Sequence, residues 1–356
     1  MEKRAKVYFL PIETIENSDI VQTLPSLLEA AGFTHLFQER DLVGIKLHFG
    51  EKGNQPPIAP NWLRPVSEMI KVQGAAPFLT DTCVLYKSKR DNAVSHLKLA
   101  QNYGFTQGKT GAPVVIADGL TGNDETDIEI PGEIFDRVSI ASAAAQASGL
   151  IVISHVTGHL VAGMGAAIKN LGMGFASRKG KLRQHANLKP YVSAALCTGC
   201  EVCTRWCPSN AIQMNNQVAV IDSAQCIGCG ECVTVCRYYA IKHDWQTEAP
   251  ELQKRMAEHA LGVIIHKRKK TGYLNFLIRI TKDCDCVGKN QTAILPDIGI
   301  LAGSDPVAID AASLELVQQF SGKQLNEMAY PIDPWIQIRH GEKIGLGTSQ
   351  YDLVTL

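Results

Sequence analysis

The chain lacks features that would point to nucleic acid or membrane partners. Its 35 basic and 35 acidic residues leave no net charge, so no overall field favours nucleic acid or an anionic membrane. No stretch of the sequence is apolar over the length that spans a bilayer. The start, MEKRAKVYFLP, has too short an apolar stretch for a signal peptide and is better interpreted as a strand. We therefore expect a cytoplasmic protein without nucleic-acid or membrane partners.

Signatures of flavin and nicotinamide cofactors are also missing. The glycine-rich stretch at residues 158–174, GHLVAGMGAAIKNLGMG, follows an expected strand, as phosphate-binding loops do. Its G-x-G-x-x-G register breaks at Ile168, and it contains no G-K-S or G-K-T. Two interpretations stay open: a backbone-lined anion or substrate loop with Lys169 and Asn170 as donors, or close packing of a helix on a strand.

The cysteines of this chain follow a regular spacing. Eight of its 11 cysteines form two copies of C-x2-C-x2-C-x3-C, and each position of the second copy lies 29 residues after its counterpart. The first copy is Cys197, Cys200, Cys203 and Cys207, and the second is Cys226, Cys229, Cys232 and Cys236. This is the spacing of two-cluster bacterial ferredoxins, and it predicts one-electron transfer.

In that spacing, the fourth cysteine of each copy belongs to the other cluster. We therefore assign Cys197, Cys200, Cys203 and Cys236 to one 4Fe–4S cluster, and Cys226, Cys229, Cys232 and Cys207 to a second. Structural zinc is the alternative, but zinc sites use two pairs of ligands rather than interleaved quartets. An odd number of cysteines with this spacing also argues against a secreted disulfide scaffold.

The rest of the chain alternates short apolar runs with helical patterns. Runs that read as strands are Ala5–Leu10, Val43–Phe49, Pro77–Thr80, Val114–Ala117 and Leu150–Ser154. The segments 61–73, 140–148 and 250–265 read as helices, and a further helix begins at Asp305-Pro306. This order predicts an α/β domain with a largely parallel sheet, formed by residues 1–190 and 244–356. Residues 191–243 would be an inserted ferredoxin-like α+β module.

Polar residues cluster near the expected strand ends. His155 lies at the carboxyl end of one expected strand and His48 near the end of another, where α/β proteins place their sites. His155 and His159 would share one face if the segment were helical; chance spacing is the competing interpretation. In the segment Asp283–Cys286 (DCDC), an extended strand would turn both cysteines to one side. That segment is interpreted as a further metal site at Cys284 and Cys286, as a redox-active thiol pair, or as two buried small residues.

These motifs together carry a resemblance to a family. The segments are GIKLHFGEKGN, FLTDT, IADGLTGND, KNLGMGFASRKGKLRQH, DCDC and PDIGILAGSDPVAID, with the two-cluster insert. They resemble Fe–S-centre proteins of the domain-of-unknown-function 362 type. The resemblance implies an α/β domain interrupted by a ferredoxin-like module, and no particular reaction. Positions that match the family motifs are Lys46, His48, His159, Lys169, Asn170, His185, Asp283, Cys284, Asp285, Cys286 and Asp305. Cys83 departs from the pattern and is discounted as a ligand.

Two functions follow as hypotheses. In the first, the protein is a redox enzyme that takes electrons from a partner such as a ferredoxin and acts on an unknown small molecule in the α/β domain. The residues expected to line that pocket and to move protons are His48, His155, His159, Lys169 and His185. In the second, it is a non-catalytic electron carrier or cofactor-assembly protein that docks on a partner. A deep polar pocket at the strand ends would favour the enzyme.

Overall fold

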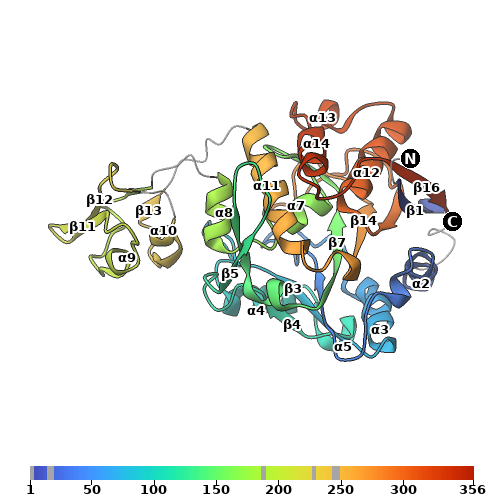
Figure 1. The fold of residues 1–356 in the computed structure, drawn as a ribbon, viewed down its shortest axis with the longest axis horizontal. Coiled ribbons are helices and arrows are strands. Elements are labelled where there is room, and N and C mark those ends of the chain that lie inside the picture. The colour runs from blue at the N-terminus through green and yellow to red at the C-terminus, as the bar shows by residue number, and fades with distance from the viewer. Residues whose placement is uncertain (1–3, 14–19, 186–189, 227–229, 243–248) are drawn as a thin grey trace.

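The computed structural model describes residues 4–13, 20–185, 190–226, 230–242 and 249–356 (Figure 1). Eight strands form one sheet in the order β16-β1-β15-β14-β7-β2-β3-β4. They are β1 (Ala5–Pro11), β2 (Leu42–Lys46), β3 (Ala76–Asp81), β4 (Val114–Ile116), β7 (Gly149–His155), β14 (Thr271–Leu277), β15 (Gly299–Gly303) and β16 (Tyr351–Thr355). Within this sheet, β15 runs antiparallel to its neighbours β1 and β14, and the other pairs are parallel. The predicted α/β class with a largely parallel sheet is confirmed.

Both faces of the sheet are covered, because its central strands are apolar on both sides. All seven residues of β7 are buried. Leu150 and Val152 belong to one hydrophobic core, and the alternate residues Ile151 and Ile153 belong to the other. A parallel strand between two helical layers needs this continuous apolar run, because side chains alternate between its two faces. The apolar run Leu150–Ser154, which predicted a buried strand, therefore lies in β7 between the two helical layers.

Helices lie on the two faces of the sheet in separate groups (Figure 1). The first core includes residues of α6 (Ser142–Gln146), α7 (Ala167–Gly172), α11 (Ala249–Ile264), α12 (Pro306–Ser321), α13 (Leu325–Met328) and α14 (Trp335–Lys343). The second includes residues of α2 (Ile20–Ala30), α3 (Arg64–Val72) and α4 (Ala93–Asn102), with the short α5 (Gln107–Thr110) beside α3. Among the described helices, none has the length and apolar character needed to cross a bilayer.

Small hairpins and single turns complete the α/β domain. The hairpins are β5 (Glu125–Glu129) with β6 (Arg137–Ala141), and β8 (Thr157–His159) with β9 (Gly163–Gly165). Short 3₁₀ turns cover Phe33–His35, Pro60–Leu63 and Arg268–Lys270. Helix α8 (Arg178–His185) follows α7 and lies at the edge of the domain that faces the cysteine-rich segment (Figure 1).

The cysteine-rich segment, residues 190–226 and 230–242, forms a small separate lobe (Figure 1). It contains β10 (Tyr191–Val192) paired with β13 (Ile241–Lys242), β11 (Ile212–Asn215) paired with β12 (Val218–Ile221), and the helices α9 (Val202–Arg205) and α10 (Glu231–Val235). Leu85 and Leu182 of the α/β domain belong to its hydrophobic cluster. Thr234 on α10 is hydrogen-bonded by the side chains of Asn123 (2.8 Å) and Arg178 (2.9 Å). The lobe is thus docked on the edge formed by α8.

Two segments beside the sheet differ from what their local patterns indicate. The alanine-rich segment 140–148, predicted to be a helix, is helical only over Ser142–Gln146, because Ile140 and Ala141 end strand β6. The DCDC segment, whose alternation would turn both cysteines to one side of an extended strand, forms a turn-rich loop after β14. In both cases the chain must change direction beside the sheet, which local propensity does not encode. The expected boundary between the cysteine-rich segment and the second part of the α/β domain, at residues 243–244, lies outside the described residues.

Glu258 on α11 holds three elements together and generates a prediction about stability. Its fully buried carboxylate accepts the backbone N–H groups of Glu133 (2.9 Å), Ile134 (3.0 Å) and Phe135 (2.8 Å), and His340 of α14 donates to it at 3.1 Å. Burial opposes ionisation, but the donor from His340 and the backbone N–H groups lower the pKa of Glu258. A carboxylate with a lowered pKa stabilises the fold above its unfolded pKa, and this contribution is lost as pH falls.

We therefore expect Glu258→Gln to lower the free energy of unfolding by about 2 kcal/mol near neutral pH, because an amide cannot accept all of these bonds. Urea denaturation measures this difference, which should shrink as pH falls below the ordinary glutamate value of 4.5. Glu251→Gln, on the same helix but in an exposed pair with Lys254, is the matched control and should cost less than about 0.5 kcal/mol. Equal effects of the two substitutions would contradict this role for Glu258.

Candidate functional site

The site lies where four neighbouring parallel strands end. Lys46 is the last residue of β2, Asp81 the last of β3, and His155 the last of β7. The DCDC loop follows β14, which pairs in parallel with β7. Because these strands are parallel and adjacent, their carboxyl ends lie along one edge of the sheet. This is the edge at which α/β proteins place their ligands.

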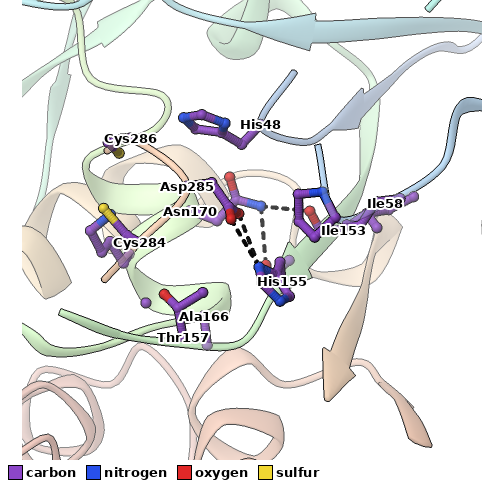
Figure 2. Close-up of a pocket in the computed structure, with 14 residues that line it drawn as sticks. His48, Ile58, Ile153, His155, Thr157, Ala166, Asn170, Cys284, Asp285 and Cys286 are labelled. Carbon is purple, nitrogen blue, oxygen red and sulfur yellow. Dashed lines mark hydrogen bonds and ion pairs between the residues drawn. The ribbon is translucent and has the colours of Figure 1, made fainter. Parts of the chain in front are cut away.

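Two adjoining cavities open at this edge. The first, which we call the His155 cavity, has an empty volume of about 470 Å³, part of it open to solvent (Figure 2). The second, the His159 cavity, has about 940 Å³ and also contains His185 in its wall. Five residues line both cavities: His48, Lys169, Asn170, Cys284 and Cys286. The five side chains predicted to carry catalysis, His48, His155, His159, Lys169 and His185, are therefore brought together in the walls of one continuous site.

A buried network of charges forms one wall of the His159 cavity. The ammonium of Lys46 lies 3.0 Å from Asp81 and donates to the amide oxygen of Asn170 at 2.7 Å. Arg90 pairs with Glu51 at 3.0 Å and lies 3.8 Å from Asp81. Burial alone would raise the pKa of Asp81, but Lys46 beside it lowers that pKa below its usual value. The carboxylates offset Lys46 and Arg90, so these cations mainly hold the wall in place.

His155 anchors the DCDC loop to the end of β7. Its Nδ1 lies 3.0 Å from the carboxylate of Asp285 (Figure 2). Its Nε2 donates to the carbonyl of Ile278 at 2.8 Å. Burial opposes protonation, but Asp285 and the carbonyl groups raise the pKa of His155. The ring is therefore an imidazolium whose two N–H groups both have protein partners. This geometry favours a positioning role for His155 over direct proton exchange with a ligand.

Cys284 and Cys286 lie on that anchored loop and form part of the wall that both cavities share (Figure 2). The neighbouring Cys284 side chain and the ammonium of Lys169 together lower the pKa of Cys286 well below its ordinary value of 9.0. The Cys286 side chain, together with burial, raises the pKa of Cys284. Of the two sulfurs, Cys286 is therefore the one that ionises more readily. Burial opposes the charge of Lys169, but the cysteines and Asp285 raise its pKa, so it remains charged.

His48 and His159 present N–H groups to the site. The Nδ1 of His48 accepts the backbone N–H of Gly50 (3.0 Å), and the Nδ1 of His159 accepts those of Val161 (3.1 Å) and Ala162 (2.8 Å). In each neutral ring the proton is therefore on Nε2. Burial, with Lys169 nearby, lowers the pKa of His159 to about 3, so this ring stays neutral near pH 7. The two histidines are hydrogen-bond donors to whatever the cavities hold.

Some residues that matter here were missed by the sequence analysis. Tyr86 and Arg90 line the His159 cavity but belonged to no recognised motif, and Lys181 on α8 stood in the segment KNLGMGFASRKGKLRQH without a role. Asp81 stood in the segment FLTDT without a role, although a carboxylate at the end of a buried strand is itself a signal. Of the other family-motif positions, Asp305 caps helix α12, and Asp283 is hydrogen-bonded by the hydroxyl of Tyr330. Neither lines the two cavities described above.

The cysteines of the lobe lie apart from these cavities. Cys197, Cys200, Cys203 and Cys236 line a single small cavity of about 360 Å³ within the lobe. Backbone N–H groups donate to three of the sulfurs: Ala219 to Cys197 (3.5 Å), Ala211 to Cys207 (3.2 Å) and Ala240 to Cys236 (3.3 Å). Cys207 and Cys226 are half-buried and Cys232 is buried, whereas Cys229 lies outside the described residues. Amide donors to sulfur are typical of iron–sulfur sites.

A site for a single metal ion is not formed in the described ranges, where no three or more His, Cys, Asp or Glu side chains are placed to coordinate one ion. The predicted metal site at Cys284 and Cys286 therefore remains a prediction. A four-iron cluster is larger than a single ion and holds its thiolates further apart, so the quartet around the lobe cavity suits it better than an individual metal.

Comparison with known families decides the classification. The sequence model described as "Domain of unknown function (DUF362)" matches residues 43–315, which is most of the chain. This protein belongs to the DUF362 family. The resemblance predicted from the sequence motifs is confirmed at the level of the family. Comparison with curated proteins finds no match.

Two solved structures show a distant likeness to this DUF362 protein. One is the lactate racemase apoprotein from Thermoanaerobacterium thermosaccharolyticum, with 10% identity, a TM-score of 0.44, and coverage of 89% of this chain and 57% of the racemase. The other is a Thermotoga maritima protein solved by the Northeast Structural Genomics Consortium, with 7% identity, a TM-score of 0.44, and coverage of 85% and 58%. This chain thus spans less than two thirds of either structure. With TM-scores below 0.5, neither likeness bears on the activity of this chain.

The His155–Asp285 pair of this DUF362 protein gives a prediction with a defined pH window. A histidine with a raised pKa stabilises the fold below its unfolded value of 6.5, and this contribution is lost as pH rises through the folded pKa. Asp285, whose pKa is lowered by His155 against the effect of burial, contributes above 3.8 and loses this as pH falls. The pair is therefore at full strength between these two values.

We expect Asp285→Asn to lower the free energy of unfolding by about 3 kcal/mol at about pH 6, because it leaves a buried imidazolium without its counter-ion. The loss should be smaller at about pH 9, because the contribution of the imidazolium is lost as pH rises through the raised pKa of His155. Chemical denaturation at the two pH values measures it. Asp352→Asn, which breaks an exposed pair with Arg4, is the control and should cost less than about 1 kcal/mol at either pH. A loss that does not change with pH would contradict the charge assignment.

Proposed function

We propose that this DUF362 protein is an iron–sulfur redox enzyme that acts on a small molecule bound at the carboxyl edge of its sheet. Residues 191–243 would form a ferredoxin-like module with two 4Fe–4S clusters. The observation that supports this most is the placement of α8, which contributes to both parts. Leu182 on α8 packs in the cysteine lobe, and its neighbour Lys181 lines the His159 cavity. Cysteine lobe and pocket would then form one functional unit.

Two interleaved quartets would hold the clusters. The donor set is all thiol, and amide N–H groups already point to three of the sulfurs. One quartet would be Cys197, Cys200, Cys203 and Cys236, which share the lobe cavity, and the other Cys226, Cys229, Cys232 and Cys207. When bound, the clusters would supply electrons one at a time to the site. Such clusters are oxygen-sensitive, and we therefore place the protein in the cytoplasm.

Within the pocket, the chain's own groups would bind the substrate and move protons. Lys169 reaches both cavities, and its ammonium makes no hydrogen bond within the described part of the chain. It is therefore a cation available to a substrate oxygen or carboxylate. The Nε2–H groups of His48 and His159 would donate to the same molecule, and His185 would complete this wall. His155 would act by positioning the DCDC loop.

A second function, electron carrier or cofactor-assembly protein, has its own supporting observation. Trp206 and Tyr238 on the cysteine lobe are 52% and 50% exposed, and Cys200, which lines the lobe cavity together with Tyr238, is exposed as well. Exposed aromatic residues near a cluster suit the docking of another redox protein. In the enzyme, the same surface would receive the electron donor, such as a ferredoxin. The two cavities at the strand ends, which a carrier does not need, make the enzyme our first choice.

Iron content tests the cluster assignment. Protein purified without oxygen should contain about eight iron atoms per chain, two clusters of four, by elemental analysis. Cys203→Ser should lower the iron content by about half and alter the electron paramagnetic resonance spectrum of the reduced protein. Cys83→Ser is the matched control, because Cys83 is buried in the α/β domain and was discounted as a ligand. Zinc in place of iron, or equal iron loss in both variants, would refute the assignment.

Oxidation of the reduced clusters tests the enzyme against the carrier. A panel of small oxidants is mixed with anaerobically reduced protein, and cluster bleaching is followed by visible absorbance. For the true substrate, Lys169→Met and His159→Gln should slow reoxidation by about 100-fold or more, since each removes a group that binds or protonates it. Lys71→Met, on exposed α3, should leave the rate unchanged. A carrier would show the same rates in all variants.

A further inference from the structure

Two thiols in the wall shared by both cavities have no role in the function proposed above. Cys284 and Cys286 are separated by one residue, and each lines both cavities. Their loop is fixed on several sides. Asp285 pairs with His155, the side chain of Gln291 accepts the N–H of Asp283 (2.9 Å), and the hydroxyl of Thr281 donates to the carbonyl of Asp283 (2.7 Å). Such anchoring is unnecessary for two small residues that merely fill a core.

The backbone conformation brings these cysteines within bridging range. In an extended strand, Cα atoms two residues apart stand about 7 Å apart, which exceeds the span of a disulfide. The loop turns at Asp285 and Cys286 instead, and a turn shortens that separation. Both cysteines also line the same two cavities. The turn, in place of an extended strand, is thus the feature that makes a bridge geometrically accessible.

We propose that Cys284 and Cys286 are a redox-active dithiol–disulfide pair that stores two electrons at the wall of the substrate cavities. In the oxidised form, one S–S bond joins the two sulfurs. Two electrons and one proton break that bond and give the Cys284 thiol and the Cys286 thiolate. Each of the two 4Fe–4S clusters would supply one electron, and for this source of electrons the inference rests on the proposed function. The pair would in turn reduce a small-molecule disulfide by thiol–disulfide exchange.

Thiol–disulfide exchange with the bound substrate takes place in two steps. The Cys286 thiolate attacks one sulfur of the bound disulfide, forms a mixed disulfide and releases the first product thiolate. Cys284, after giving up its proton, attacks Cys286, restores the Cys284–Cys286 bond and releases the second product thiolate. The proton of Cys284 goes to one product, and a proton from solvent neutralises the other. Two electrons have then passed from the pair to the substrate.

The surroundings distinguish the two sulfurs. Lys169 faces the pair from α7, and His48 faces it from the segment after β2. Both favour negative charge on Cys286, so this sulfur is the attacking group and Cys284 the resolving one. Tyr86 lies near both cysteines, and the preceding residue, Leu85, belongs to the same hydrophobic cluster as Cys232 of the lobe. The pair therefore lies on the side of the pocket that leads toward the cysteine lobe.

Digestion with trypsin gives a direct test, because cleavage after Lys282 and Lys289 releases residues 283–289, DCDCVGK, with these two cysteines and none of the other nine. Full-length protein, purified without oxygen, is treated with oxidised glutathione, alkylated and digested. The peptide should be two mass units lighter and unalkylated, because two hydrogens are lost when the bond forms. Reduction with dithionite after the glutathione treatment, and before alkylation, should restore two alkylation sites. Cys284→Ser should instead trap a glutathione adduct on Cys286.

Alkylation rates provide a second test, because they would not depend on Lys169 if the two cysteines had only a structural role. Cys286 should react fastest in the reduced protein, and Lys169→Met should slow it by about tenfold. Residues 72–87 form a tryptic peptide with the single cysteine Cys83, whose burial raises its pKa. That peptide is the internal control and should react slowly in both proteins.

Two results would overturn the inference. One is a 283–289 peptide that takes up two alkyl groups after the glutathione treatment. The other is a non-iron metal that co-purifies and is lost in Cys284→Ser, since the cysteines would then be ligands. Absence of iron–sulfur absorbance with a normal disulfide result would refute the proposed function alone, and only the electron source would need replacing. A normal iron content with an alkylated peptide would refute the thiol pair alone.

Discussion

The parallel alignment of β14, β7, β2 and β3 is the constraint on which the rest of the structure depends. Hydrogen bonds between these strands set the register that brings Lys46, Asp81 and His155 to one edge. A parallel sheet buried on both faces must be apolar along its length, so its polar groups collect where the strands end. The site is therefore a direct consequence of how this sheet is built. Loops that follow the strands supply the remaining groups.

Burying so many charged groups beside the sheet costs desolvation free energy, and pairing with groups of opposite charge offsets it. Lys46 lies against Asp81, Arg90 against Glu51, and His155 against Asp285. Breaking any of these pairs would leave a buried charge alone, which costs more than the pair contributes. The groups without such a carboxylate at hydrogen-bond distance, Lys169 and the Nε2–H groups of His48 and His159, are those left for a ligand or for Cys286. Structural and chemical tasks are thus divided among neighbouring residues.

Much of the scaffold could be predicted because its signals are local. The apolar run that became β7 and the Asp305-Pro306 start of α12 each follow from a few adjacent residues. The histidines could be grouped because strand ends meet at one edge. The turn at the DCDC loop could not be predicted, since it depends on Asp285 reaching His155, 130 residues away. Likewise, Tyr86 and Arg90 reach the site through the path of the chain after β3, which no local sequence pattern indicates.

The double use of α8 has a consequence for how this protein can change over time. Consecutive residues on this helix, Lys181 and Leu182, belong to the pocket wall and to the packing of the cysteine lobe. Gly230 lies so close to the Leu182 side chain that even one added methyl group would overlap it. A lobe grafted from another protein would therefore have to bring a matching glycine and helix face with it. We expect the lobe and the pocket to be inherited as one block, with accepted substitutions on one side answered by substitutions on the other.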